Sequence, residues 1–336
     1  MTDSAPATPS LTVILLTRNE ERHLARALDS VAPFAQAIVI VDSGSTDATV
    51  AIAERHGARV HRRPWTNYAD QFQWALDHGG IETDWVMRLD ADEVIEPDLA
   101  ATLAATLPTL DADVTGINLW RKHIFMGRFI RHGGRYPLVL LRIWRRGAGR
   151  IEQRWMDEHM IVDHGRTITL RGGFADINLN DLTFFTTKHN GYATREAIDV
   201  LSGRYGLLPD DRGLSSRTAS RQASLKRGIK ERVYNRLPLG VGPLGYFLWR
   251  YIFQLGVLDG APGLIYHFLQ GFWYRFLVDA KVREYEMGLA GAADNAERLR
   301  RLAAMTGHPL DDRRREVGRP QGQAPDGQRL DDRRAS

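Results

Sequence analysis

Between residues 11 and 89, short apolar runs alternate with stretches in which apolar residues recur every three or four positions. The apolar runs have the length of buried strands and lie at residues 11–16, 38–41, 59–61 and 85–89. The intervening stretches have the periodicity of amphipathic helices. Apolar strands separated by single helices are typical of a parallel sheet with helices on both faces. The pattern therefore predicts an α/β fold with a Rossmann-like, mostly parallel sheet, which strand-like runs at 114–125 and 138–144 extend with some antiparallel pairing.

Composition and missing motifs exclude several classes of protein. The chain is 43% hydrophobic and 26% charged, as globular proteins are, and its net charge is only +4. It has no cysteine, which excludes a disulfide scaffold, a thiolate zinc site and a cysteine nucleophile. It also lacks the glycine motifs of phosphate loops, dinucleotide sites and nucleophile elbows. Kinase, dehydrogenase and serine-hydrolase functions are therefore not indicated.

Three acidic loops follow three of the predicted strands, at residues 17–21, 42–47 and 90–93. Each loop alone could be a turn, a helix cap or a solvated surface loop. Together they occupy the carboxyl edge of the sheet, where folds of this class bind ligands. The spacing of Asp90 and Asp92 suits Mg²⁺ or Mn²⁺, which takes one or two carboxylates and fills its other positions with phosphate oxygens and water. Such a cation neutralises charge on a departing diphosphate.

These three motifs, in this order, resemble those of the family 2 glycosyltransferases, which are inverting enzymes of the GT-A fold with nucleotide-sugar donors. The resemblance covers roughly residues 10–190 and is strongest to bacterial lipopolysaccharide-core and exopolysaccharide transferases. It implies that Asp42 contacts the base, that Asp90 faces the ribose or the metal, and that Asp92 is the main metal ligand. The residues that it implies for nucleotide binding are Thr17, Asn19, Glu20, Asp42, Ser43, Gly44 and Asp90.

The resemblance also implies a general base that takes the proton of the acceptor hydroxyl, and a carboxylate is the usual choice. The first candidate is Glu158, because related core transferases place a His-Glu pair after a similar arginine-rich strand. In this chain the order is Asp-Glu-His, which leaves Asp157 as a second candidate. A surface turn without chemistry is the third interpretation of this segment.

The C-terminal third differs in character from the rest. Residues 212–232 contain seven Lys or Arg and one acidic residue, and residues 237–278 are rich in aromatic side chains. Their apolar stretches are interrupted by Arg, His, Gln, Gly and Pro, so neither of the two best windows is a comfortable transmembrane segment. We expect amphipathic helices lying in the headgroup interface of an anionic membrane. The alternative is that the aromatic residues form a second core or a dimer contact.

The predicted organisation is a disordered N-terminus at 1–10, a GT-A catalytic domain at 11–200, a basic linker and membrane-associating helical region at 201–291, and a disordered tail at 292–336. The predicted function is metal-dependent transfer of a hexose to a hydroxyl of a glycolipid or polysaccharide of the cell envelope. The default donor is a UDP-sugar, because enzymes of the family that the chain resembles commonly use it. The expected location is cytoplasmic, peripheral on the inner face of the membrane. The alternatives are a polyprenyl-phosphate glycosyltransferase and a non-catalytic basic module that binds nucleic acid or anionic lipid. No nucleic-acid partner is expected, and the sequence does not indicate an oligomeric state.

Overall fold

The computed structural model describes residues 9–152, 159–208, 238–308 and 310. Within these ranges the chain divides into two compact units. The first contains the described residues up to Gly191 together with those from Pro238 to Leu277, and the second contains those from Tyr192 to Leu208 and from Val278 onward. The domain boundary expected near residue 200 falls inside the continuous helix α5 (Leu182–Tyr205).

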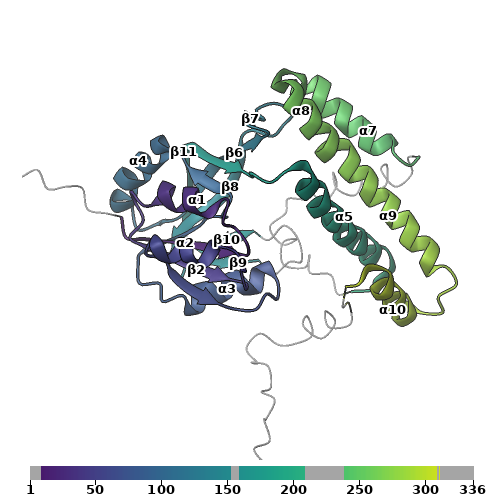
Figure 1. Cartoon of the computed structure of the whole chain (residues 1–336), viewed down its shortest axis with the longest axis horizontal. Helices are drawn as coiled ribbons and strands as arrows, with labels where there is room; N and C mark the ends of the chain where they lie inside the picture. Colours follow the sequence, from purple (N-terminus) through teal and green to yellow (C-terminus); the bar gives the residue numbers. More distant parts are fainter. Residues whose placement is uncertain (1–8, 153–158, 209–237, 309, 311–336) are drawn as a thin grey trace, which may run out of the picture. The chain divides into compact units, whose positions relative to one another are not determined.

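The first unit is built on one large sheet (Figure 1). The main path of this sheet runs β3-β2-β1-β4-β8-β6-β11-β5, with β7 paired to β6. The strands of the sheet are β1 (Leu11–Thr17), β2 (Ala37–Asp42), β3 (Arg59–Arg62), β4 (Trp85–Arg88), β5 (Glu93–Ile95), β6 (Val114–Phe125), β7 (Arg128–Phe129), β8 (Leu138–Arg145) and β11 (Arg166–Ile177). The first four strands are parallel, and β6 is parallel to β11. β8 runs antiparallel between β4 and β6. The short strands β9 (Gly149–Ile151) and β10 (Met160–Val162) form a separate antiparallel pair.

Helices cover both faces of the sheet, as the apolar runs predict. The helices of this region are α1 (Leu24–Val31), α2 (Thr49–Arg55), α3 (Tyr68–His78), α4 (Pro97–Thr106) and the 3-10 turn η1 (Leu107–Thr109). Val13 and Leu15 of β1 pack into the core shared with α1, α2 and α4, whereas Ile14 packs into the core shared with α3. Burial of such a side chain contributes roughly 1.5–3 kcal/mol, so a strand buried on both faces is a strong organising element. The predicted α/β class is confirmed.

The remaining elements are helical. They are α5 (Leu182–Tyr205), α7 (Val241–Leu248), the π-helix η3 (Trp249–Phe253), the 3-10 turn η4 (Gly256–Asp259), α8 (Gly260–Tyr266), the π-helix η5 (His267–Trp273), α9 (Tyr274–Leu289) and α10 (Asn295–Thr306). The chain reverses around η4, so that α7 packs beside η5. Within the described ranges, no helix has both the length and the hydropathy needed to cross a bilayer.

Helix α10 lies within the segment that the sequence predicts to be a disordered tail. Asp294 caps the helix by accepting a hydrogen bond from the backbone N–H of Glu297, at 2.7 Å. Leu299 and Leu302 are buried on its inner face, and Gly307 ends it in a left-handed conformation. The segment is rich in arginine, which favoured a prediction of disorder, but residues 295–306 form an ordinary amphipathic helix.

Candidate active site

Asp42 organises the loop that follows β2. The register of the sheet places it opposite Thr17 at the end of β1, and Thr17 Oγ1 donates to Asp42 Oδ2 at 3.0 Å. The backbone N–H groups of Gly44 and Ser45 donate to Asp42 Oδ1 at 3.0 and 2.9 Å. The Ser45 hydroxyl donates to the other oxygen at 2.5 Å, and only 1% of Asp42 is exposed. Both carboxylate oxygens of Asp42 therefore accept hydrogen bonds that fix the conformation of the loop.

The two neighbouring acidic loops are joined to each other. The Asn19 amide oxygen accepts a hydrogen bond from the Thr46 N–H at 2.8 Å, and the Asn19 N–H donates to the Ser45 hydroxyl at 2.8 Å. Asn19 adopts a positive φ of 57°, which Asn tolerates better than most residues. Glu20 is half-buried, and its carboxylate pairs with His23 Nδ1 at 2.7 Å. The loops thus form one hydrogen-bonded rim.

Open space borders this rim at Gly44. Gly44 has a φ of 87°, and a Cβ built on it would meet no atom within 4 Å. Ser43, on the other side of Asp42, accepts a hydrogen bond from Gln71 Nε2 of α3 at 3.1 Å. The N-terminal half of α3 also carries Tyr68, whose hydroxyl donates to Asp90 at 2.9 Å. Helix α3 therefore contacts both the loop of Asp42 and the loop of Asp90.

Asp90 is neutralised by arginines from two strands. Arg88 Nε lies 3.5 Å from Asp90 Oδ1, and Arg142 Nη2 lies 3.4 Å from Asp90 Oδ2. Burial alone would raise the pKa of Asp90, but the charges of Arg88 and Arg142 outweigh it and hold the pKa below its usual range. Asp90 is therefore a paired carboxylate whose ionised form the two arginines favour.

Glu93, the last acid of the motif, is a structural group. It is 1% exposed, and its Oε1 lies 2.5 Å from Arg142 Nη2 and 3.5 Å from Arg121 Nη1. Its other oxygen accepts the Asp90 N–H at 3.0 Å, which fixes the turn between the two acids. Burial raises the pKa of Glu93 to about 7 in spite of the arginines. Glu93 therefore fixes the loop through its contacts with Arg142 and with the backbone of Asp90.

Asp92 has a different environment from its neighbours. Asn178 Nδ2 donates to Asp92 Oδ2 at 3.0 Å. Burial, followed by the charges of Asp176 and Asp90, raises the pKa of Asp92. Asp176 is itself paired with His123, at 3.1 Å, and with Arg121, at 3.5 Å, so its pKa is lowered although burial opposes this. The negative potential at Asp92 is thus only partly compensated.

A divalent cation fits Asp92 better than Asp90. Asp90 already accepts from Tyr68 and faces two arginines, whereas Asp92 lies among negative charges that a cation would neutralise. No group of three or more His, Cys, Asp and Glu side chains in the described residues is arranged to hold a metal. One or two carboxylates suffice for Mg²⁺ when phosphate oxygens and water complete the coordination. Of the two aspartates, Asp92 is therefore the one that could hold such an ion.

Sequence reasoning missed the residues that support the motif. Arg142 could have been noticed as a lone cation within the apolar run 138–144, and Arg88 as a cation at the end of β4. Asp176 and Asn178 carry no such local signal, because only the pairing of β11 brings them to the motif. Glu158 and Asp157, the candidates for the general base, lie outside the described residues.

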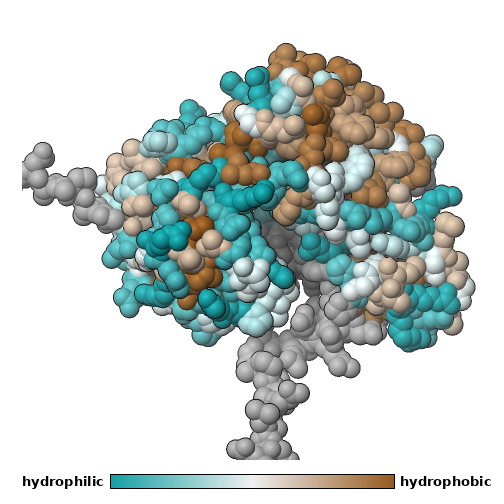
Figure 2. All heavy atoms as spheres, viewed as in Figure 1, coloured by the Kyte–Doolittle hydropathy of each residue, from teal (hydrophilic) through white to brown (hydrophobic). Residues whose placement is uncertain are grey.

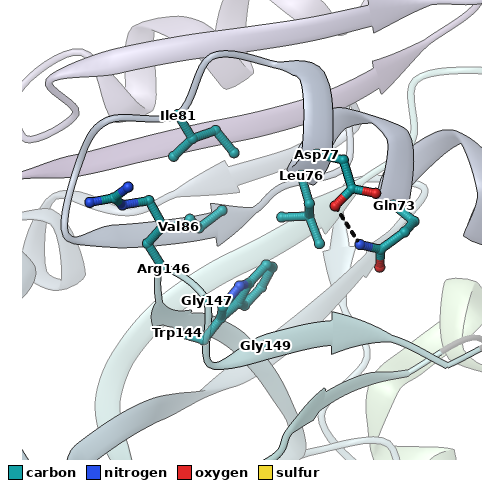
Figure 3. A pocket seen from close by; sticks show the side chains of 9 residues that line it. All are labelled: Gln73, Leu76, Asp77, Ile81, Val86, Trp144, Arg146, Gly147 and Gly149. Atoms are coloured by element: carbon teal, nitrogen blue, oxygen red, sulfur yellow. Dashed lines mark hydrogen bonds between the residues drawn. The ribbon is translucent and has the colours of Figure 1, made fainter.

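A separate pocket of about 220 Å³ lies between α3 and the turn that joins β8 to β9 (Figure 3). Its walls include Leu76, Val86 and Trp144, and Gln73 donates to Asp77 at 3.0 Å on one side of it. None of the residues predicted to bind the nucleotide or the metal lines this pocket. It is distinct from the carboxyl edge of the sheet.

Comparison with known proteins bears on this arrangement. The model of the family described as glycosyl transferase family 2 matches residues 12–176, which include all of β1 but its first residue, the acidic loops and Asp176. The chain is 30% identical over 196 residues to the lipopolysaccharide core biosynthesis glycosyltransferase LpsC of Rhizobium meliloti (strain 1021), covering 56% of this chain and 70% of LpsC. The chain belongs to glycosyl transferase family 2. The family predicted from the three acidic motifs is therefore confirmed.

Other family-level similarities are shorter. An uncharacterized glycosyltransferase of Rickettsia conorii is 40% identical over 92 residues, which is 27% of this chain. The chain thus spans only about a third, 32%, of the length of that relative. Glucosyl-3-phosphoglycerate synthase of Mycobacterium tuberculosis, solved with Mn²⁺, UDP and glucosyl-3-phosphoglycerate, overlaps with a TM-score of 0.30 and 24% identity, covering 34% of this chain and 45% of that one. That overlap is too partial to bear on the site.

Proposed function

We propose that this chain is an inverting, metal-dependent glycosyltransferase that moves a hexose from a nucleoside diphosphate sugar to a hydroxyl of a glycolipid or polysaccharide. The observation that carries the proposal is the contrast between Asp90, which is paired, and Asp92, whose pKa is raised by burial and by neighbouring carboxylates. A carboxylate in uncompensated negative potential, at the carboxyl edge of the sheet, favours a cation and its phosphate ligands.

The proposed donor site uses the two rim loops and Asp92. Thr17, Asn19, Ser43 and Gly44 would line the nucleotide, and the open space beside Gly44 supports this placement. Asp42 would act by holding the loop, since both of its oxygens already accept hydrogen bonds. Asp92 would hold Mg²⁺ or Mn²⁺, which supplies neutralisation of the diphosphate when bound. UDP is the proposed nucleotide because it is common among similar enzymes.

In the proposed reaction the acceptor oxygen attacks the anomeric carbon and the bond from that carbon to the diphosphate oxygen breaks, with inversion. The proton of the acceptor hydroxyl passes to a carboxylate, for which Glu158 is the first candidate and Asp157 the second. The bonding electrons leave with the nucleoside diphosphate. This balance requires one base and no redox partner.

The proposed biological setting is cell-envelope biosynthesis, which the similarity to LpsC supports. The proposed organisation is a catalytic domain at 11–200 and a membrane-associating region at 201–291, with the enzyme attached peripherally to the inner face of the cytoplasmic membrane. The seven basic residues at 212–232 support attraction to anionic lipid, although this segment lies outside the described residues.

The donor site is tested by calorimetry with UDP-, GDP- and dTDP-sugars, with and without Mn²⁺. We expect Mn²⁺ to strengthen the binding of one donor, and Asp92→Asn to weaken that metal-assisted binding at least about tenfold. Asp77→Asn is the matched control. It changes an exposed carboxylate near the C-terminal end of α3 and should bind the donor as the wild type does. If neither Mn²⁺ nor the Asp92→Asn change alters the affinity for any of the three donors, the result would contradict the proposal and favour a non-catalytic module.

The acceptor chemistry is tested by a variant that combines Asp157→Asn with Glu158→Gln. A hydroxyl acceptor needs a base, so turnover should be lost while donor binding is retained. Turnover that persists would favour a phosphate acceptor, as in a polyprenyl-phosphate glycosyltransferase, because an ionised phosphate attacks without such help.

A further inference from the structure

The segment from Pro238 to Tyr274 hides its charged groups instead of exposing them. In this sequence its only Lys, Arg, His, Asp or Glu residues are Arg250, Asp259 and His267. They are 4%, 2% and 0% exposed. The surface of an ordinary water-soluble domain is rich in charged side chains, so a helical region without any exposed charge is unusual.

Large apolar side chains occupy the surface that the charges avoid. Phe253 is 69% exposed, Leu258 55% and Trp249 54%. Figure 2 shows hydrophobic residues gathered over α7 and α8. The exposed large apolar residues of this segment are Leu239, Val241, Leu244, Leu248, Trp249, Ile252, Phe253, Leu255, Val257, Leu258, Leu264 and Phe268. We call this set the apolar face. A contiguous apolar surface of this kind marks an interaction site.

The loop that joins β7 to β8 keeps these three ionisable groups inside. Asp259 accepts hydrogen bonds from His132 Nδ1, at 2.7 Å, and from the His132 N–H, at 3.0 Å. Arg250 Nε donates to the carbonyl of Gly133 at 2.5 Å. The ring of His267 packs so closely on Gly133 that a Cβ there would lie 2.2 Å from His267 Cε1. Burial and the charge of Arg250 lower the pKa of His267 to about 4, so it is neutral at physiological pH.

The rim of the apolar face is basic. Residues 126–137 carry Arg128, Arg131 and Arg135 and no acidic residue. Arg128 and Arg131 are exposed, and Arg128 Nη2 lies 3.5 Å from the carbonyl oxygen of Leu258, at the edge of the face. Cations beside exposed Trp and Phe match the order of layers in a bilayer, where anionic headgroups lie outside the acyl chains.

We infer that the apolar face inserts into one leaflet of an anionic lipid bilayer, with Arg128 and Arg131 at the level of the headgroups. The inference rests on the proposed peripheral attachment and assigns it to a surface within the described residues. A second copy of the chain is the less suitable occupant, because a two-fold contact between apolar faces would bring two basic rims together. The attachment is hydrophobic and needs the charges of Arg250 and Asp259 and the neutral ring of His267 to stay buried.

The test is sedimentation of the full chain with phosphatidylcholine vesicles that contain phosphatidylglycerol. We expect binding to survive high salt. Phe253→Glu or Trp249→Glu should weaken it at least about tenfold, since each variant puts a charge in place of exposed apolar area that the bilayer would bury. Met287→Glu is the matched control: Met287 is 73% exposed but lies outside the apolar face, so this variant should bind as the wild type does. Far-ultraviolet circular dichroism and thermal unfolding should show that all three variants keep the wild-type fold, because the replaced side chains are exposed.

A second measurement locates the face in the membrane. Brominated lipid should quench part of the tryptophan emission of the wild type, and Trp249→Phe should remove that part while binding remains. Equal vesicle binding by the wild type and by Phe253→Glu would overturn the inference. The inference would also be overturned if neither protein bound vesicles and ultracentrifugation showed that the wild type is a dimer and Phe253→Glu a monomer.

The outcome is separable from that of the proposed function. Vesicle binding is measured without any sugar, and Asp92→Asn should bind vesicles as the wild type does. Loss of donor binding in Asp92→Asn with normal vesicle binding would support both proposals. Donor binding without any vesicle binding by the wild type would leave the glycosyltransferase proposal intact and remove the lipid-facing surface.

Discussion

The carboxyl edge of the sheet and the apolar face treat buried charge in opposite ways. At the edge, Arg88, Arg121 and Arg142 compensate Asp90 and Glu93, and Asp92 remains in negative potential. Beneath the apolar face, Asp259 and Arg250 are each held by the loop that follows β7, and charge is kept away from the surface. One region thus keeps a carboxylate that is only partly compensated, and the other keeps charged groups off its surface. The same rule, that buried charge needs a partner, serves both.

The largest expected effect in this comparison is the loss of Arg142. Arg142→Ala leaves Glu93 and Asp90 without the cation that lies 2.5 and 3.4 Å from them. Breaking a buried pair on one side costs about 3–5 kcal/mol, so the free energy of unfolding in urea should fall by that amount. Arg146→Ala, an exposed arginine from the same segment, should cost less than about 0.5 kcal/mol. Similar values for the two variants would show that the cluster at the edge does not depend on Arg142.

Two glycines with similar backbone conformations sharpen the contrast between open and filled space. Gly133 has a φ of 65° and lies against His267, whereas Gly44 has a φ of 87° and faces no atom within 4 Å. Gly133→Ala should therefore cost about 2–4 kcal/mol from backbone strain and steric overlap, and Gly44→Ala only about 1–2 kcal/mol from strain. Thermal unfolding of both variants measures the difference. Gly44→Ala should in addition weaken donor binding, and a Gly44→Ala protein less stable than Gly133→Ala would refute this description.

The pH dependence of stability tests the neutral state of His267. Its pKa in the folded protein is about 4, below the usual value of 6.5. The unfolded chain therefore binds a proton first, and the stabilisation present above pH 6.5 is lost as the pH falls toward 4. His267→Gln should flatten this part of the profile of unfolding free energy, and His78→Gln, which changes an exposed histidine of α3, should not. Parallel wild-type and His267→Gln profiles between pH 4 and 6.5 would rule the effect out.

The smallest expected change is in the stability of Asp92→Asn. Because burial and the charges of Asp176 and Asp90 raise the pKa of Asp92, its ionised form is held at a cost to folding. Asn keeps the oxygen that accepts from Asn178 and removes the charge, so the denaturation midpoint at neutral pH should stay equal or rise. Asp42→Asn is the contrasting variant, and its midpoint should fall because a side-chain amide replaces one accepting oxygen with a donor. A large loss of stability in Asp92→Asn would assign Asp92 a structural role.

Much of the molecule was predictable because its signals are local. The periodicity of residues 11–89 predicted the parallel strands and their helices, and the acidic loops after β1, β2 and β4 predicted the family. Helix α10 was missed because arginines dominate its composition, although Asp294 and Gly307 are ordinary capping signals at its ends. The boundary predicted near residue 200 lies within α5, which has no break that composition could mark, and it stays a prediction.

The sequence by itself determined which residue types stand at the strand ends and that residues 238–274 are poor in charge and rich in aromatic side chains. Both features can be read from residues that are close together in the sequence. Only the tertiary structure decided that Arg142 neutralises Asp90 and Glu93, and that Asp176 and Asn178 meet Asp92, because sheet pairing joins distant strands. It likewise decided that Arg250, Asp259 and His267 point inward, since the groups that satisfy or enclose them belong to a loop more than a hundred residues earlier in the chain.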